Sequence, residues 1–313
     1  MAVRSTTKEF GLAVAATAQT YVALASTAFG RQIFEPSIDI EGDPVVINPV
    51  ANATRPTRTR KSLKSAKVAY KEPLVPGATA NVPPAFFDSL AASGFVITTT
   101  ATTSVATLGA VPSNDKDTNC ELFDGIHKTW AWGVRGVSKI VAENPGERLM
   151  LEFNGIGHGD RADQTAWPAG VVDDLGAGAI FEDNGLTIGA WIPEAARCSF
   201  DLEGDPIKLG NGLAADGFTE PWLKDTQAFL RFTAYKHALA AMNWDAMLDD
   251  LASNSHTATW TVPFDADLEM VITGNVMLYK RPNAADLEGV GTFPLEFQFT
   301  RLAPITITVQ EIA

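Results

Sequence analysis

An internal duplication constrains the fold of this chain more than any other feature of its sequence. Residues 37–45 read SIDIEGDPV and residues 199–207 read SFDLEGDPI, 162 positions further on. Six of these nine positions are identical, and the other three exchange one apolar residue for another. A segment repeated at a fixed offset is expected to repeat its supersecondary unit as well. The sequence therefore predicts two copies of one domain.

Two shorter blocks repeat at related offsets. FFDSLAAS at 86–93 aligns with MLDDLASN at 247–254, and LEF at 151–153 recurs at 295–297. The smaller offset of the last block predicts an insertion in the first copy, which we place in the Thr/Ala-rich stretch at about 97–119. The expected organisation is a first domain over 1–165, a linker over 166–184 and a second domain over 185–313.

The repeated block has the pattern of a strand that is buried on one face. Ile38 and Ile40 alternate with Asp39 and Glu41, and a period of two is typical of such strands. The following Asp-Pro predicts the end of this strand and a long loop after it. A second strand is expected at 66–70 in the first copy and at 229–235 in the second.

Each copy is also expected to contain one short helix and a closing hairpin. Pro83-Pro84 predicts a helix start, Phe86, Phe87 and Leu90 its apolar stripe, and Gly94 its end. In the second copy Asn243 is a candidate N-cap. Further strands are expected at the following ranges: 129–141, 147–155, 267–279, 293–301 and 305–309. The predicted fold class is mainly β, with two tandem antiparallel β-sandwich or partial-barrel domains.

The charge and the cysteines exclude several functional classes. A formal net charge of −13 repels phosphate, so we do not expect a protein that grips DNA. Cys120 and Cys198 have no partnering motif and are expected to be free, buried thiols. Gln19 and several threonines interrupt the apolar run from Gly11 to Ala25, so we interpret it as neither a signal peptide nor a membrane span.

The sequence contains few residues in the arrangements that catalytic sites require. None of the four histidines has metal-ligand spacing to a cysteine or another histidine. His158 and Asp160 could act as a general base, but no nucleophile accompanies them. We therefore expect no enzyme, no metal and no cofactor. A binding module in which Trp130, Trp132 or Trp222 stacks on sugars is an alternative, although core packing is the favoured role of these residues.

Two stretches of the first copy resemble a known family. The segment from Lys67 through Pro83-Pro84 to Phe95 places a strand before a Pro-Pro-opened helix that closes with a glycine and an aromatic residue. The glycine-punctuated run from Asp124 to Gly155 is similar to the hairpin that follows in the same family. Both resemble the tail tube (major tail) proteins of long-tailed, non-contractile bacteriophages. The chain departs from the shorter members by carrying the pattern twice.

The resemblance implies a structural virion protein of the phage tail. In such proteins four inner strands of each domain join those of neighbouring domains in a ring-shaped barrel, and the rings stack into a tube that conducts double-stranded DNA into the host. The partners implied are further copies of the chain and other tail proteins at the tube ends. The location implied is the virion tail, after assembly in the cytoplasm of the host bacterium.

Barrel geometry limits the size of such a ring. Six four-stranded domains, with strands about 4.8 Å apart and tilted by roughly 40°, give a backbone diameter of about 50 Å. Inward side chains leave about 40 Å, which passes a duplex, whereas three domains leave about 15 Å. Since each chain is predicted to hold two domains, a trimeric ring with pseudo-sixfold symmetry is favoured, and a hexamer of chains is the alternative.

Two sets of charged residues are candidate functional residues. Carboxylates on the polar faces of the predicted strands could line the channel and repel phosphate, or could simply be solvated: Asp39, Glu41, Glu152, Asp201, Glu203 and Glu296. Basic residues of the first long loop could contact an acidic surface of the next ring: Arg55, Arg58, Arg60, Lys61 and Lys64. The matching loop of the second copy carries Asp216, Glu220 and Asp225. A solvated charge run and a nucleic-acid contact are the other interpretations of the basic loop.

Three other functions are compatible with these sequence features. They are a secretion-type tube protein of related fold, a capsid decoration protein and a carbohydrate-binding β-sandwich.

Overall fold

A computed structural model provides the structure of this chain. It describes residues 9–15, 20–47, 58–113, 115–124, 127–142, 144–163, 178–182, 185–210, 218–235, 256–283, 285–287, 290–300 and 303–312. Of residues 42–47, 58–64, 209–210, 218–220 and 286 the backbone alone is described.

The described part of the chain is built almost entirely from β-strands. In the first half they are β1 (Glu9–Val14), β2 (Phe34–Ile47), β3 (Arg58–Pro73), β4 (Val96–Thr99), β5 (Thr103–Leu108), β6 (Thr118–Phe123), β7 (His127–Ala142) and β8 (Met150–Asp163). In the second half they are β9 (Gly185–Ile188), β10 (Ala195–Gly210), β11 (Phe218–Tyr235), β12 (His256–Pro263), β13 (Leu268–Leu278), β14 (Ala285–Leu287), β15 (Val290–Phe299) and β16 (Ile305–Glu311). The two short helical elements are η1 (Ser26–Phe29) and α1 (Phe87–Ala92). The predicted mainly β, antiparallel class is confirmed.

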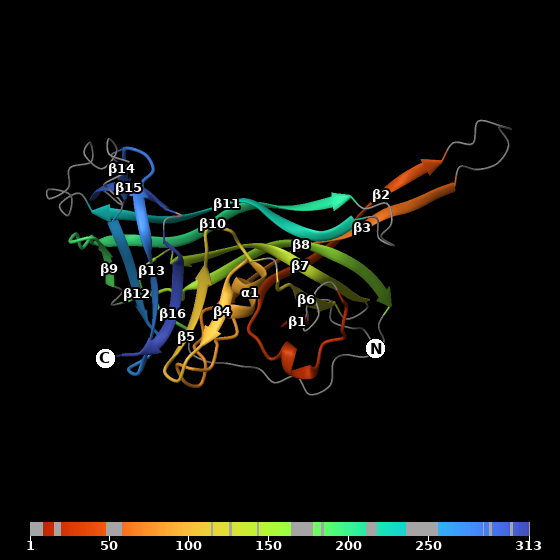
Figure 1. Ribbon diagram of the computed structural model, residues 1–313, viewed down its shortest axis with the longest axis horizontal. Helices are drawn as coiled ribbons and strands as arrows, with labels where there is room; N and C mark the ends of the chain where they lie inside the picture. The colour runs from red at the N-terminus through yellow and green to blue at the C-terminus, as the bar shows by residue number, and fades with distance from the viewer. Residues whose placement is uncertain are drawn as a thin grey trace.

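The strands form one continuous sheet along the long axis of the molecule (Figure 1). Its central order is β2-β3-β8-β7-β10-β11-β15-β13, followed by β16-β5-β4. The first four strands come from the first half of the sequence, and the next four repeat their order with strands from the second half. The two groups join where β7 pairs with β10.

The hairpins β2–β3 and β10–β11 share their register. Asp39 pairs with Lys67 and Asp201 pairs with Phe229, so both members of the second pair lie 162 positions after those of the first. A register shift follows Glu41 in β2, and another follows Glu203 in β10 at the same offset. The repeated Glu-Gly-Asp-Pro sequence thus lies opposite a β-bulge in each hairpin, because the extra residue belongs to the partner strand, β3 or β11.

The pairing of each hairpin with its next strand is less alike. Tyr70 of β3 pairs with Phe153 of β8, whereas Phe232 of β11 pairs with Leu295 of β15. Since Leu295 corresponds to Leu151 in the repeat, the second contact is displaced by two residues. A displacement of two keeps every side chain on its original face of the sheet.

The predicted break at each Asp-Pro is wrong. Both strands continue past the bulge, to Ile47 in β2 and to Gly210 in β10. The expected long loops are therefore mostly the outer parts of hairpins, because a bulge absorbs the irregularity that we expected to end the strand. The β2–β3 hairpin projects beyond the rest of the molecule (Figure 1).

The predicted helix of the first copy is confirmed as α1. Phe86, Phe87 and Leu90 are buried, and Gly94 follows the helix with a φ of +91°, a conformation that favours glycine. The corresponding helix expected near Asn243 in the second copy lies outside the described residues.

The predicted insertion and the described part of the predicted linker pack as parts of the folded structure. Residues of the 97–119 stretch form β5, which pairs with β16 at the other end of the sequence. Of the predicted 166–184 linker, the described part includes Ala179 and Phe181, both buried in the core. The main-chain N–H of Ala179 donates to Leu74 O at 2.8 Å, so this segment is a structural part of the sheet margin.

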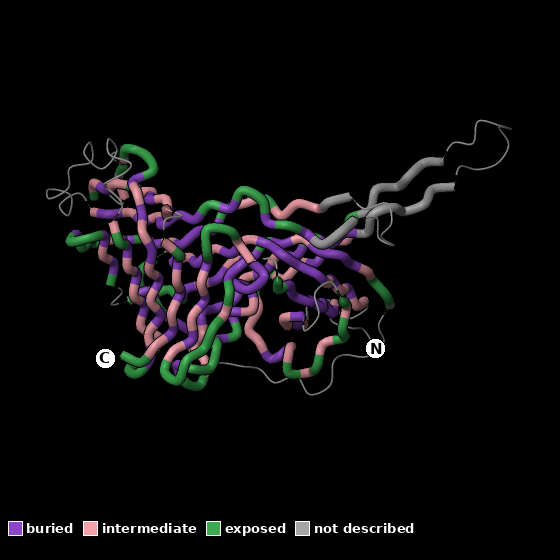
Figure 2. Tube along the Cα trace, viewed as in Figure 1, coloured by how far each residue is buried: buried purple, intermediate pink, exposed green. Residues whose placement is uncertain are grey.

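One face of the central sheet is buried and the other is open. Buried and partly exposed residues alternate along the strands (Figure 2), as a sheet with one covered face requires. Phe153, Phe200 and Phe297 on the covered face are fully buried. Helix α1 contacts β7, β1 and β6 on this side. No helix in the described ranges is long and apolar enough to cross a membrane.

Candidate functional site: the charged face of the sheet

The open face carries a ladder of alternating charges. Lys71 of β3 pairs in register with Glu152 of β8, which pairs with Lys139 of β7, which pairs with Asp201 of β10. The Lys71 Nζ lies 3.2 Å from a Glu152 oxygen, and the Lys139 Nζ lies 3.7 Å from an Asp201 oxygen. Opposite charges directly across neighbouring strands stabilise the register that places them there. This ladder crosses the junction between the two groups of strands.

Arg231 of β11 continues the charged face into the second copy. Its guanidinium donates to the carboxylates of Asp201 and Glu296 and lies 2.7 Å from Glu203. The same guanidinium lies 4.6 Å from the centre of the Phe229 ring, within the range of a cation–π contact. Lys280 adds a further contact to Glu296 at 2.5 Å. One arginine therefore binds three of the six predicted carboxylates.

The pKa shifts of Glu296, Glu41 and Arg231 have the directions that pairing with opposite charges produces. Partial burial acts to raise the pKa of Glu296, but hydrogen bonds and charges of Lys280 and Arg231 outweigh it and lower the pKa. The hydrogen bond from Lys67 lowers the pKa of Glu41. Burial opposes the charge of Arg231, yet its three carboxylate partners raise its pKa. The charged forms are therefore favoured on both sides of these pairs.

The first-copy end of this face is more exposed than the rest. Lys67 and Glu41 form an ion pair at 2.7 Å with both side chains about half exposed. Asp39 is exposed and forms no ion pair with another described residue. Its counterpart in the repeat, Asp201, is 4% exposed and bound by two cations. The two equivalent aspartates thus have different environments.

All six predicted carboxylates lie on the open face, but five of them are paired. The neighbouring strands supply the cations that pair with them: Lys67, Lys71, Lys139, Arg231 and Lys280. A signal for Lys67 and Lys71 was present, since they alternate with buried residues of β3. The pairing of Arg231 with Glu296 could not be found, because β15 is distant in sequence from β11.

The predicted basic loop falls on the projecting β2–β3 hairpin. Arg55 lies outside the described residues. The next four predicted residues lie on β3, where the backbone is described but the side chains are not: Arg58, Arg60, Lys61 and Lys64. Of the predicted acidic loop, Asp216 and the side chain of Glu220 are also not described. Asp225 is exposed on β11 with a φ of +50° and lies 3.3 Å from Lys224.

The outer part of the second hairpin lies over the first-copy strands. The buried Arg135 of β7 donates through Nη1 to Pro221 O of β11 at 3.0 Å. Gly204 and Pro206 of β10 line a depression of about 440 Å³ together with residues of the first copy: Ser37, Asp39, Lys67, Val137, Asn154 and Ile156. The β10–β11 hairpin thus packs on its neighbour, while the β2–β3 hairpin projects away (Figure 1).

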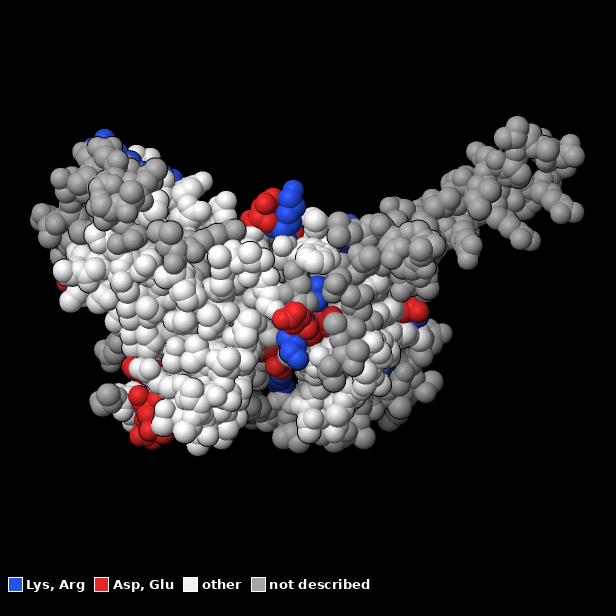
Figure 3. Space-filling view, viewed as in Figure 1, with Lys and Arg blue, Asp and Glu red and all other residues white. Residues whose placement is uncertain are grey.

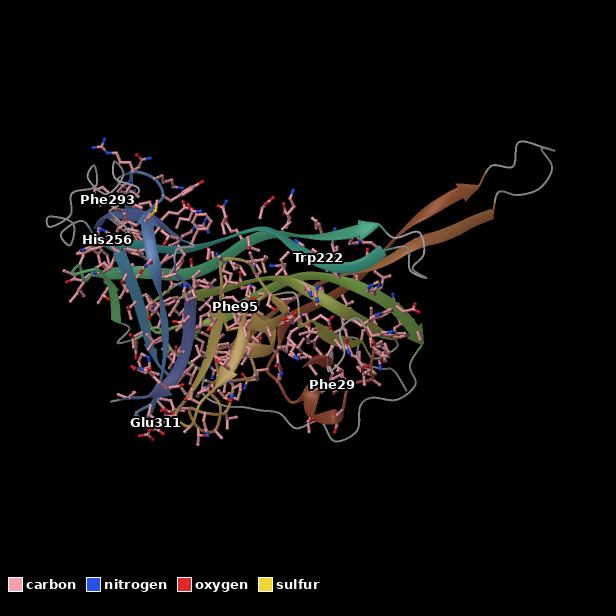
Figure 4. All side chains as sticks on the ribbon, viewed as in Figure 1. Phe29, Phe95, Trp222, His256, Phe293 and Glu311 are labelled. Atoms are coloured by element: carbon pink, nitrogen blue, oxygen red, sulfur yellow. The ribbon has the colours of Figure 1, made fainter. Side chains whose placement is uncertain are left out.

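Trp130 and Trp132 pack against other aromatic side chains, whereas Trp222 is exposed. Trp130 and Trp132 lie 5.7 and 5.9 Å from the ring of Tyr21, and Trp132 stacks on His158 at 5.5 Å. His158 is 6% exposed, so it is poorly placed as a general base with Asp160. Trp222 is 42% exposed and lies on the outer part of the β10–β11 hairpin, apart from the core around Phe95 (Figure 4).

The described residues contain no group of three or more potential metal ligands among His, Cys, Asp and Glu. Cys120 and Cys198 are free and buried, as predicted. Acidic and basic side chains also lie side by side away from this face, in the region of α1 and β1 near the middle of the view in Figure 3. The geometry of the site therefore suits an assembled or interacting surface with locally balanced charge.

No protein-family model matches the chain, and no curated protein has a significant sequence match to it.

Proposed function

We propose that this chain is a structural subunit of a bacteriophage tail tube, in which its copies close into rings and the rings stack around a channel for double-stranded DNA. The observation that carries the proposal is the order of the central sheet. Four strands of the first half are followed by four strands of the second half in the same order, within one continuous sheet. Such a unit can be extended by further copies of itself.

The ends of this unit support closure into a ring. Within the described residues β2 pairs with β3 alone, so its other edge is available. Exposed strand edges favour pairing with another chain, and a closed barrel removes them. A contact between unlike edges is heterologous, so a fixed rotation between copies gives a closed ring.

The dimensions favour three chains in each ring. Three chains of eight central strands supply about 24 strands, which at a spacing of about 4.8 Å and a tilt of roughly 40° give a diameter of about 50 Å. Inward side chains reduce this to about 40 Å, which accommodates a duplex with its hydration. A ring of six chains would be about twice as wide and remains the alternative.

The charged face suits the wall of a DNA channel for a reason that differs from simple repulsion. Its lysines and arginine are already bound by carboxylates, so they are poorly available to phosphate. The unpaired Asp39 and the overall acidic charge add repulsion. DNA would then move along this surface without specific binding. In this proposal the protein is a component of the virion tail and has no catalytic role.

Imaging of the purified chain tests the proposal. Negative-stain micrographs at increasing protein concentration are expected to show rings or tubes of uniform diameter, and native mass measurement is expected to give three chains per ring. A protein that remains monomeric at all accessible concentrations would refute it. Uniform rings of six chains would retain the function and replace the favoured stoichiometry.

A further inference from the structure

We infer that the free edge of β2 in one chain pairs with the C-terminal end of β13 in a second copy, and that this contact repeats the β7–β10 junction found within each chain. The inference rests on the proposed function and adds to it the residues that join neighbouring subunits. The partner is therefore a second copy of this chain.

The β7–β10 junction provides the template. Cys198 to Asp201 of β10 pair with Ala142 to Lys139 of β7. The buried Phe200 packs beneath this contact, and the Lys139–Asp201 ion pair lies above it. By the offset of 162, the residues of β2 that correspond to this part of β10 are 36–39. They lie on the edge of β2 that no described strand covers.

The matching position on β13 is also available. Val276 pairs with His256 of β12 and with Phe299 of β15, so these two strands flank β13 on opposite sides. Beyond Val276 the β12 side has no strand partner among the described residues, whereas β15 continues beside Leu278. In the first copy β6 likewise ends part-way along β7, and β10 takes its place.

The register of the predicted contact follows from the hairpins. Lys139 pairs with Glu152 in the first copy, and the Tyr279 N–H donates to Glu296 O at 2.9 Å in the second. Tyr279 therefore takes the place of Lys139, and Asp39 takes the place of Asp201. We expect Asp39 of one chain to lie opposite Tyr279 of the next.

Exposure and charge support the same contact. Tyr279 is 52% exposed, and Phe34 at the start of β2 is 46% exposed, whereas Ala196, the counterpart of Phe34 in the repeat, is 4% exposed. Asp39 is exposed and forms no ion pair with another described residue, while Asp201 is buried and paired. The end of β13 carries the exposed Lys280, a cation that can approach the incoming carboxylate.

The packing of the hairpins supports a second part of the interface. In the first copy Val137 and Asn154 pair across β7 and β8 beneath the bulge of the β10–β11 hairpin. Met277 and Gln298 form the corresponding pair of the second copy, and they line a depression of about 470 Å³. The projecting β2–β3 hairpin of the neighbouring chain would lie on this side, as β10–β11 does within the chain.

Site-directed cross-linking tests the inference. Asp39→Cys and Tyr279→Cys are combined in the full-length chain and oxidised under conditions that allow assembly. Cross-strand neighbours have Cα atoms about 4.5–5.5 Å apart, within the range that a disulfide spans. We expect a ladder of cross-linked chains that ends at the closed ring. Asp39→Cys combined with Glu311→Cys is the matched control, since both positions are exposed but Glu311 lies at the end of β16, away from the proposed contact, and it should give no ladder.

The possible outcomes separate the inference from the proposed function. Rings or tubes that form without cross-links above the control would overturn the inference and leave the function intact. A chain that stays monomeric would overturn both. The native Cys120 and Cys198 should not form disulfides with the introduced cysteines, because both are buried.

A single charge reversal gives an independent readout if the double variant folds poorly. Asp39→Lys places a cation opposite the end of β13 and near Lys280, so we expect assembly to require about tenfold more protein, as judged by light scattering. Glu311→Lys makes the same charge change at the end of β16, away from the proposed contact, and should assemble as the wild type does. Equal assembly of the two variants would contradict the inference.

Discussion

Replacing Arg231 with methionine should destabilise the fold, because this arginine satisfies the most deeply buried charge of the open face. Its side chain is 30% exposed, whereas its partners Asp201 and Glu296 are 6% and 11% exposed. In the Arg231→Met variant Glu296 retains Lys280, but Asp201 retains a single cation, Lys139, at 3.7 Å. Methionine fills most of the volume above Phe229, so the loss is chiefly electrostatic.

The expected magnitude follows from the burial of the partners. A hydrogen bond to a charged group contributes about 1.5–3 kcal/mol, and a buried ion left without its partner costs about 3–5 kcal/mol. Since Arg231 is partly solvated, one cation remains near Asp201 and one near Glu296, and Glu203 is exposed, we expect a loss of about 3 kcal/mol. For a chain of 313 residues this corresponds to a fall in melting temperature of about 4 °C.

Thermal unfolding followed by circular dichroism measures this change, and Lys67→Met is the matched control. Lys67 also bonds a carboxylate on the same face, but both members of the Lys67–Glu41 pair are about half exposed. Exposed pairs contribute little, so the control should melt with the wild type. Equal melting temperatures for Arg231→Met and the wild type would refute the argument that Asp201 depends on this arginine.

The pH dependence of the same variant gives a second measurement. The pKa of Glu296 is lowered in the folded protein, so its contribution to stability is present above the unfolded value of 4.5 and is lost as the pH falls through the folded value. Removing Arg231 removes part of that contribution. The melting temperatures of the wild type and Arg231→Met should therefore converge below about pH 4. A constant difference across this range would contradict the assignment.

Three further changes test other parts of the structure. Gly94→Ala should destabilise by at least about 2 kcal/mol in urea titrations, because φ is +91° and a Cβ would lie 2.6 Å from Pro112 Cβ. Burial raises the pKa of the Glu72 carboxyl despite the charge of Arg31, so the contribution of Glu72 to stability declines as the pH rises above 4.5. The difference in melting temperature between the wild type and Glu72→Gln should therefore shift against the wild type as the pH rises. Burial also raises the pKa of the Cys120 thiol to about 12 and that of Cys198 well above its ordinary value, so neither should react with a thiol reagent at pH 8 until the protein unfolds.

The sequence by itself determined the local elements of this protein. Alternation of Ile38 and Ile40 with acidic residues identified a strand, and Pro83-Pro84 with Gly94 delimited a helix, because these signals act over a few residues. The repeat also predicted the same order of elements in both copies, whereas the shared register and bulge of the two hairpins were seen only in the structure. It further placed all six candidate carboxylates on polar strand faces.

The tertiary structure alone decided how the strands are ordered and which charges meet. Contacts between different strands decide three features of the sheet. They are the pairing of β5 with β16, the continuation of β2 through Asp43-Pro44 and the Lys71–Glu152–Lys139–Asp201 ladder. The period of a strand fixes which side chains share a face, but the neighbour of that face is chosen by packing and register over the whole sheet. For this reason the sequence placed the carboxylates and the structure supplied their cations.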